Sequence, residues 1–223
     1  MHIEKQGWAT VLALGTLLAW DASGLDIPLA EWFGNSQGFA LRDNWLLSGV
    51  LHEGGRLLAW ALVLALCVGA VLPWGPLRRL PLSRRIQLAA TPLVGALAVS
   101  LLKSTSASSC PWDMHAFGGV AQHVSHWQWT LHDGGSGHCF PAGHATAGFS
   151  FLGGYFVYQA QPNIARRWLV GAMLAGAVFG LAQQMRGAHY TSHTLWTAWL
   201  CWTVAWIGDV AHQHFAGGRH AQA

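Results

Sequence analysis

The chain has 223 residues, of which 52% are hydrophobic and only 9% are charged, and its formal net charge is +3. Soluble domains carry roughly 25% charged residues, so this composition excludes an ordinary soluble globular protein. It predicts an all-α integral membrane protein.

Six apolar runs approach the roughly 20 residues that a helix needs to cross a bilayer. They are Gly7–Ser23, Gly55–Val71, Ile86–Leu102, His144–Ala160, Trp168–Met185 and Thr194–Val210. The length leaves no room for a second globular domain. We therefore predict one domain over residues 1–223, a bundle of six transmembrane helices.

The first run resembles a secretory signal, because Lys5 precedes it and the small residues Ala22, Ser23 and Gly24 stand at its end. We favour an uncleaved anchor, since bulky and charged residues stand where small residues would mark a cleavage site.

The cations predict the orientation of the bundle. With the N-terminus inside, eight lysines and arginines fall on the inner side and four on the outer side, which satisfies the positive-inside rule. The inner cations are Lys5, Arg78, Arg79, Arg84, Arg85, Arg166, Arg167 and Arg219; the outer ones are Arg42, Arg56, Lys103 and Arg186. Both termini are then cytoplasmic. The positive net charge is thus explained by the orientation of the protein in the membrane, and no nucleic-acid partner is expected.

Two outer segments carry polar groups. His52, Glu53 and Arg56 stand at the outer mouth of the second span, where they either face a polar cavity or extend towards lipid headgroups. The long outer loop, residues 104–143, is rich in Ser, Gly, Trp and His. Such a loop is a lid or substrate rim, or a disordered linker.

A short turn precedes the fourth span. Pro141 and Gly143 bracket it, and His144 opens the apolar run that follows, which places this histidine in the first turn of a helix, where free N–H groups attract anions. Because successive spans alternate in direction, Lys103, His144 and the segment 186–193 reach the same membrane face. A cation and several histidines therefore converge at the outer interface.

These residues resemble the type-2 phosphatidic acid phosphatase superfamily, whose fold is shared with vanadium haloperoxidases. The family pattern is Lys-x6-Arg-Pro, then Pro-Ser-Gly-His, then Ser-Arg-x5-His-x3-Asp. Lys103 is followed after six residues by Cys110-Pro111, and Pro141-Ala142-Gly143-His144 matches the second motif with Ala for Ser. His189 takes the position of the third-motif histidine, and His193 stands where Asp is expected. The core motifs thus extend over residues 103–193.

The resemblance implies a role for each matching residue. His189 would be the nucleophile that forms a phosphohistidine, and His144 would protonate the leaving group and then activate water. Lys103 and the amides of Ala142 and Gly143 would hold the phosphate oxygens. The resemblance implies no metal and no other cofactor.

Where the chain departs from the family pattern, other residues are expected to replace the missing arginines and the missing aspartate. Gln183 stands where the third-motif arginine is expected, so Arg186 would supply the guanidinium, and Arg56 would replace the arginine lost at Cys110. His193 can orient His189 but cannot supply a negative charge. An assisting acid would come from elsewhere on the outer side, and the candidates are Glu53, Asp113 and Asp133.

The outer cysteines add a covalent prediction. Cys110 and Cys139 both lie outside, where an oxidising bacterial periplasm permits a disulfide between the first two motifs; two free thiols are the alternative. His189 and His193, four residues apart, would alternatively share a metal ion. We rank that site low, because Lys103 and Arg186 would repel a cation.

The resemblance thus implies a hydrolase of lipid phosphate monoesters or diphosphates, at the periplasmic face of a bacterial inner membrane. Its partners would be an amphiphilic lipid phosphate and the surrounding membrane lipids. Undecaprenyl diphosphate, phosphatidic acid, phosphatidylglycerol phosphate and lipid A phosphates all meet this description. The alternatives are a lipid phosphotransferase and a non-catalytic protein that binds or transports lipid phosphates. The sequence leaves the oligomeric state open.

Overall fold

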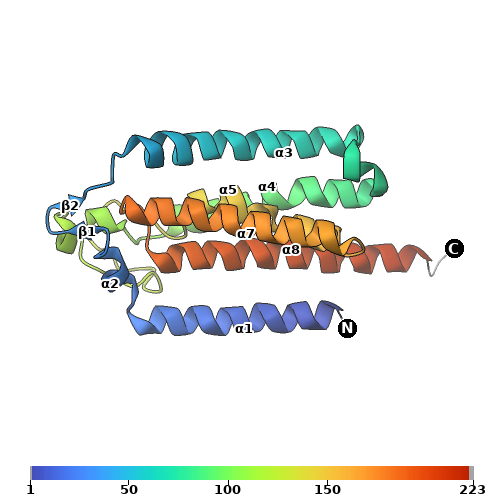
Figure 1. Cartoon of the computed structure of the whole chain (residues 1–223). Coiled ribbons are helices and arrows are strands. Elements are labelled where there is room, and N and C mark those ends of the chain that lie inside the picture. Colours follow the sequence, from blue (N-terminus) through green and yellow to red (C-terminus); the bar gives the residue numbers. More distant parts are fainter. Residues whose placement is uncertain (1, 221–223) are drawn as a thin grey trace.

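The structure, a computed structural model, is a bundle of long helices that lie side by side (Figure 1). It describes residues 2–220 and the side chains of residues 4–215. The long helices are α1 (His2–Ser23), α3 (Gly55–Val71), α4 (Leu82–Thr105), α7 (Pro162–Met185) and α8 (Thr191–His220). The prediction of a mostly helical protein is confirmed.

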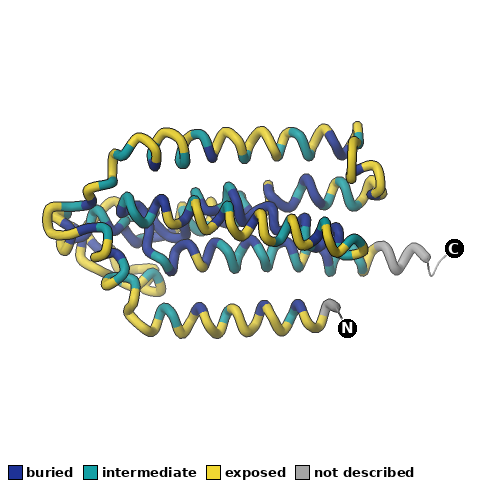
Figure 2. The backbone as a smooth tube through the Cα atoms, in the orientation of Figure 1, coloured by how far each residue is buried: buried dark blue, intermediate teal, exposed yellow. Residues whose placement is uncertain are grey.

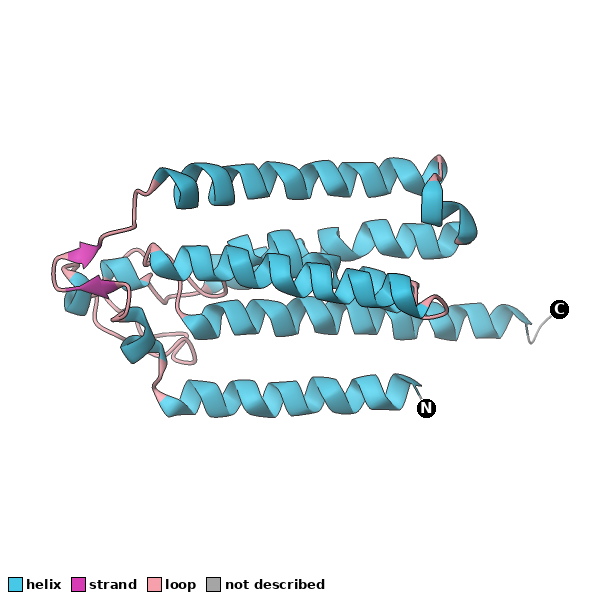
Figure 3. Ribbon diagram, in the orientation of Figure 1, coloured by secondary structure: helices cyan, strands magenta, loops and turns pink. Residues whose placement is uncertain are grey.

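The shorter elements lie mainly at one end of the bundle and in the interrupted fourth span. They are α2 (Asp26–Ala30), β1 (Gly34–Asn35), β2 (Gly38–Phe39), the π-helix η1 (Leu46–Gly54), and the 3-10 turns η2 (Gly75–Arg79), η3 (Pro111–Asp113) and η4 (His115–Phe117). The fourth span consists of η5 (Gly143–Ala145), α5 (Thr146–Phe149), η6 (Ser150–Leu152) and α6 (Gly153–Val157). The two short strands pair antiparallel, with Gly34 opposite Phe39 (Figure 3).

Three helical segments among the described residues are long and apolar enough to cross a membrane: Leu46–Arg79, Leu82–Thr105 and Pro162–Met185. The other three predicted spans are helical but do not meet that measure. The fourth is broken into short segments, and α1 and α8 contain tryptophan, threonine and histidine, which lower mean hydropathy. The structure fits a membrane protein, and the count of six spans stays a prediction.

The chain alternates in direction, as predicted. The described ends of α1 and α8 near the two termini lie at one end of the bundle, together with the turn between α3 and α4 (Figure 1). The opposite end holds α2, the two strands and the long loop between α4 and η5. Arg219, one of the predicted inner cations, lies outside the residues whose side chains are described.

The interrupted fourth span lies in the middle of the bundle and packs against α4, α7 and α8. Glycine makes this possible, because a Cβ atom on Gly148 would lie 2.0 Å from the backbone nitrogen of Gly176 in α7. The surrounding core is apolar and includes Val99, Phe149 and Leu152. In Figure 2 the central helices are largely buried, whereas α3 and α1 expose most of their length. Their exposed apolar side chains suit contact with lipid.

Candidate functional site

The three motifs meet at the loop end of the bundle. The turn before His144 is tied to the start of α8, because the Ala142 N–H donates to the His193 carbonyl at 3.1 Å. The Thr197 hydroxyl lies within hydrogen-bonding distance of the carbonyls of both residues, at 3.0 Å and 2.9 Å. The amide of Ala142 is therefore occupied. Of the two amides expected to bind phosphate, Gly143 is the one left for that role.

Lys103 lies at the end of α4 beside this turn. A Cβ atom on Gly143 would stand 3.7 Å from Cδ of Lys103, so the lysine stem runs along the glycine. Its charge also acts on His189: burial first and the Lys103 ammonium second hold the pKa of His189 well below its ordinary value of 6.5. Lys103, Gly143 and His189 are thus brought together, and His189 is a neutral imidazole at pH 7.

His189 and His193 form a buried pair. Their Nδ1 atoms lie 3.5 Å apart, at the long limit of a hydrogen bond, and the side chains are 7% and 2% exposed. With Nδ1 of His189 facing its partner, Nε2 is the ring nitrogen left for chemistry. A neutral imidazole with a free nitrogen is a competent nucleophile.

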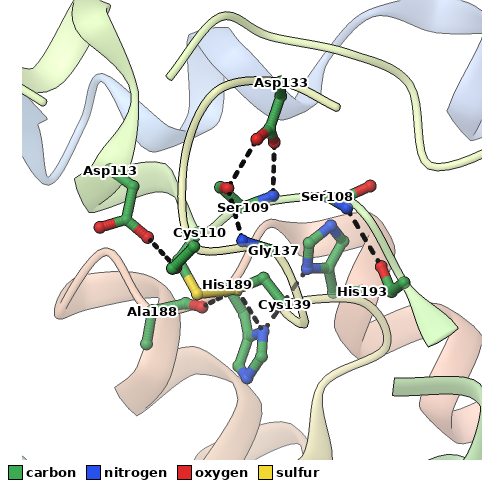
Figure 4. Close-up of a disulfide and its surroundings, with 12 residues drawn as sticks. Ser108, Ser109, Cys110, Asp113, Asp133, Gly137, Cys139, Ala188, His189 and His193 are labelled. Atoms are coloured by element: carbon green, nitrogen blue, oxygen red, sulfur yellow. Dashed lines mark hydrogen bonds between the residues drawn. A yellow bond between two sulfur atoms is a disulfide. The ribbon is translucent and has the colours of Figure 1, made fainter. Parts of the chain in front are cut away.

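The predicted disulfide between Cys110 and Cys139 is confirmed. It joins the end of the first motif to the residues just before the second, and Sγ of Cys139 lies 3.5 Å from Nδ1 of His189 (Figure 4). Cys139, His189 and His193 place their donor atoms within 4.8 Å of one another. A disulfide sulfur is not a thiolate, however, so this trio offers two metal donors of the usual kind.

His144 lies at the mouth of the site, where it stacks on His52 from the π-helix η1. The two ring centroids are 3.5 Å apart and the planes differ by 11°. Nε2 of His144 lies 2.8 Å from the His52 carbonyl, to which it donates, so Nδ1 is the unprotonated nitrogen of the neutral ring. The sequence placed His52 near the membrane surface, but it gave no signal of this stacking.

Arg186 occupies the outer edge of the site. Its Nε donates to the Arg42 carbonyl at 2.8 Å and its Nη1 to Oε1 of Gln183 at 3.2 Å. The guanidinium therefore lies beside the residue that stands where the family has its arginine. Burial lowers the pKa of Arg186 from its ordinary value, yet the group stays a cation at neutral pH.

The three candidate acids are engaged elsewhere. Glu53 pairs with His52 at 3.0 Å and with Arg56. Asp113 accepts from the Ser136 hydroxyl at 2.9 Å, and Asp133 accepts from the N–H and the hydroxyl of Ser109 (Figure 4). No contact between these carboxylates and His189 is found in the described part of the chain, so the expectation that one of them assists the nucleophile receives no support.

Two other carboxylates reach this end of the bundle from the first 30 residues. Asp26 accepts from the N–H of Ser192 at 3.0 Å and from its hydroxyl, which caps the N-terminus of α8. Asp21 accepts from the indoles of Trp196 and Trp127 at 2.9 Å and 3.1 Å. Their only sequence signal was their place on the outer side of the first span.

A narrow cavity opens beside His144. Its volume is about 210 Å³, and Gly143, His144 and Arg56 stand at one end of it. The rest of its lining is mostly apolar and comes from α3, α4 and the fourth span: Ala59, Trp60, Val63, Pro92, Leu93, Ala96, Ser100, Thr146, Ala147, Ser150 and Phe151. One polar end and one long apolar wall suit an amphiphilic ligand.

Comparison with known proteins agrees with this geometry. The family model described as the PAP2 superfamily matches residues 85–215. No curated protein and no solved structure matches the chain significantly. The family match covers most of α4, the disulfide, the turn at His144 and most of α8, which is more than half of the chain. The protein therefore belongs to the PAP2 superfamily, and this membership suggests a phosphatase-type activity on phosphate esters.

Proposed function

We propose that the protein is a membrane phosphatase that removes phosphate from a lipid phosphate or diphosphate through a phosphohistidine. The main observation that supports this proposal is the cavity beside His144. It joins the polar residues Gly143, His144 and Arg56 to an apolar wall formed by α3 and α4. A lipid headgroup would lie at the polar end while its tail follows the wall towards the bilayer.

The transfer would begin at His189. Its free Nε2 attacks phosphorus, a P–N bond forms and the P–O bond to the lipid breaks. The ammonium of Lys103, the amide of Gly143 and the guanidinium of Arg186 would offset the charge of the phosphate oxygens. Water then attacks the phosphohistidine and releases inorganic phosphate.

His144 would act as the acid and then as the base. In the free protein its Nε2 proton is held by the His52 carbonyl at 2.8 Å. Proton delivery to the leaving oxygen therefore requires a second proton, on Nδ1, because a neutral imidazole is too weak an acid to give up its only proton. The neighbouring Glu53 carboxylate would favour the doubly protonated state, whereas burial and the stacked ring of His52 would oppose it.

We place the site at the periplasmic face of a bacterial inner membrane. The inner-side cations with described side chains fall at the opposite end of the bundle, in keeping with the positive-inside rule, and the disulfide suits an oxidising compartment. No sequence feature chooses among the four lipid phosphates named above.

The test is phosphate release in detergent micelles from those four lipids, without added metal and again with a chelator. Release that resists the chelator and is lost in both His189→Ala and His144→Ala supports the phosphohistidine route. Transfer of phosphate to an added lipid instead of water would make the protein a phosphotransferase. Release that persists in His189→Ala, or lipid binding without any release, contradicts the proposal.

A further inference from the structure

A second cavity is lined by His193 but by none of the other residues of the proposed phosphate site. Its volume is about 80 Å³, and it is enclosed by the end of α1, the start of α2 and the long outer loop. The polar groups that line it come from distant parts of the chain and include Asp21, Asp26, His123, His126, Tyr190 and His193. None of these residues has a role in the phosphate chemistry described above, except His193.

Two residues that line this cavity each have a buried polar atom without a hydrogen-bond partner among the described residues. The atoms are Oδ1 of Asp21 and the hydroxyl of Tyr190. The Tyr190 side chain is 4% exposed, and the side chain of Asp21 is 8% exposed. A buried polar atom without a partner lowers stability. The polar residues that line the cavity therefore favour a polar occupant.

Water fits this cavity best. One ordered water needs about 10–15 Å³ of such space and two to four polar partners, so the volume accommodates several. A metal ion fits less well, because Oδ2 of Asp21 already accepts from three N–H groups and Asp26 is committed to capping α8.

The cavity connects the catalytic pair to a carboxylate. Nε2 of His126 donates to Oδ2 of Asp21 at 3.2 Å. The ring of His126 stacks on Phe140 with centroids 4.1 Å apart, and it meets the ring of His193 edge-on at 6.2 Å. Lys103 from α4 and His123 from the loop also act on His193. The rings of His189 and Tyr190 meet it edge-on, with centroids 5.7 Å and 5.3 Å away.

The link between His193 and Asp21 matters because His193 stands where the family motif has an aspartate. Where the family has an aspartate, this chain has a histidine, which can orient His189 but cannot offset the positive charge of a phosphohistidine. Asp21 and Asp26 are the carboxylates that line the cavity behind it. The free oxygen belongs to Asp21, since both oxygens of Asp26 accept hydrogen bonds.

We propose that ordered water in this cavity links the His193 imidazole to Oδ1 of Asp21, so that Asp21 and His126 act as positioning residues for the nucleophile. This inference rests on the proposed phosphatase function. When the P–N bond forms, the Nδ1 proton of His189 moves to Nδ1 of His193, and the Nε2 proton of His193 moves through water to Asp21. Hydrolysis of the phosphohistidine returns both protons by the same route.

The first arm of the test needs no substrate. In protein with ¹⁵N-labelled histidine, the ring nitrogen shifts of His193 report which nitrogen carries the proton. We expect Asp21→Asn and Tyr190→Phe to change these shifts. Trp127→Phe is the matched control, because it removes one donor to Oδ2 of Asp21 and leaves the cavity lining intact. Shifts of His193 that stay constant in Tyr190→Phe and Asp21→Asn overturn the water link.

The second arm measures phosphate release. Asp21→Asn should lower kcat by roughly tenfold to a hundredfold, less than the ~10⁴-fold loss seen when a directly bonded triad carboxylate is removed. In a His193→Asp background, which places a carboxylate next to His189, Asp21→Asn should have no effect on kcat. An equal loss in both backgrounds would show that Asp21 only supports the fold and would overturn the inference. If the parent protein releases no phosphate, the proposed function fails, and the NMR arm still decides whether the water link exists.

Discussion

At the scale of single residues, the Lys103 cation acts on the neutral imidazole of His189, the proposed nucleophile. The Lys103 ammonium acts on His189 strongly enough to contribute to its lowered pKa. The same charge stands where the equatorial phosphate oxygens would lie, beside Gly143. Electrostatic stabilisation of this kind is usually the largest contribution to such a reaction.

Replacing Lys103 by methionine tests this arrangement. Lys103→Met keeps the stem along Gly143 and removes the charge, so we expect phosphate release to fall by roughly 10²–10³-fold, the usual effect of removing one stabilising donor. Steady-state kinetics in micelles measure the change. Lys5→Met, in the exposed part of α1 at the other end of the bundle, is the control and should leave kcat unchanged. Similar rates for both variants would contradict the role of Lys103.

Buried histidines also predict how stability depends on pH. Burial lowers the pKa of both His189 and His126 below the 6.5 of an unfolded chain. Below pH 6.5 the unfolded chain therefore binds protons that these folded residues do not, and the free energy of unfolding falls as the pH drops. Thermal unfolding in detergent between pH 7.5 and 5 should show a falling midpoint. The fall should be smaller in His126→Gln than in His132→Gln, a change at an exposed loop position; equal slopes would refute this account.

At the scale of elements, the fourth span decides how closely the motifs approach one another. It is broken into short helical segments, and glycine lets it lie directly against α7. This packing fixes the turn that carries Gly143 and His144. An apolar run of that length in the sequence does not distinguish a broken helix from a continuous one.

Gly148→Ala is the test of this packing. Its new Cβ would meet the backbone of Gly176 at 2.0 Å, which cannot move as a flexible side chain would, and overpacking of this kind costs about 1–3 kcal/mol or more. The matched control is Gly171→Ala in α7, where a Cβ meets nothing within 4 Å and alanine favours the helix. We expect a lower unfolding midpoint for the first variant and an equal or higher one for the second. A lower unfolding midpoint for Gly171→Ala than for Gly148→Ala would show that the fourth span packs less closely against α7 than described.

At the scale of the whole molecule, one end of the bundle holds the proposed site and the other holds most of the predicted inner cations. The described ends of α1 and α8 near the termini share the second end (Figure 1). The orientation in the membrane follows from this separation of charge if the positive-inside rule applies.

Cysteine labelling in intact cells tests the orientation. Ser36→Cys lies in the exposed turn between β1 and β2, and Arg79→Cys lies in the exposed turn before α4. With the site outside, an impermeant maleimide should label Ser36→Cys in intact cells and Arg79→Cys only after permeabilisation. Both variants belong in a Cys67→Ala background, because Cys67 is a free, exposed thiol in α3. Labelling in the opposite order would place the site on the cytoplasmic side.

The sequence by itself determined the helical class, the shared end of Lys103, His144 and the segment 186–193, the family and the disulfide partners. Each of these depends on local composition, on the alternation of spans or on motif spacing, which a linear chain records directly. Only the tertiary structure decided that the Ala142 amide is already bonded, that His52 stacks on His144, and that Asp21 and Asp26 reach α8 from the first 30 residues. These contacts join segments separated by about 50 to 175 positions in the chain. The physical reason is that side-chain partners across such separations depend on helix rotation and close packing, which no local pattern encodes.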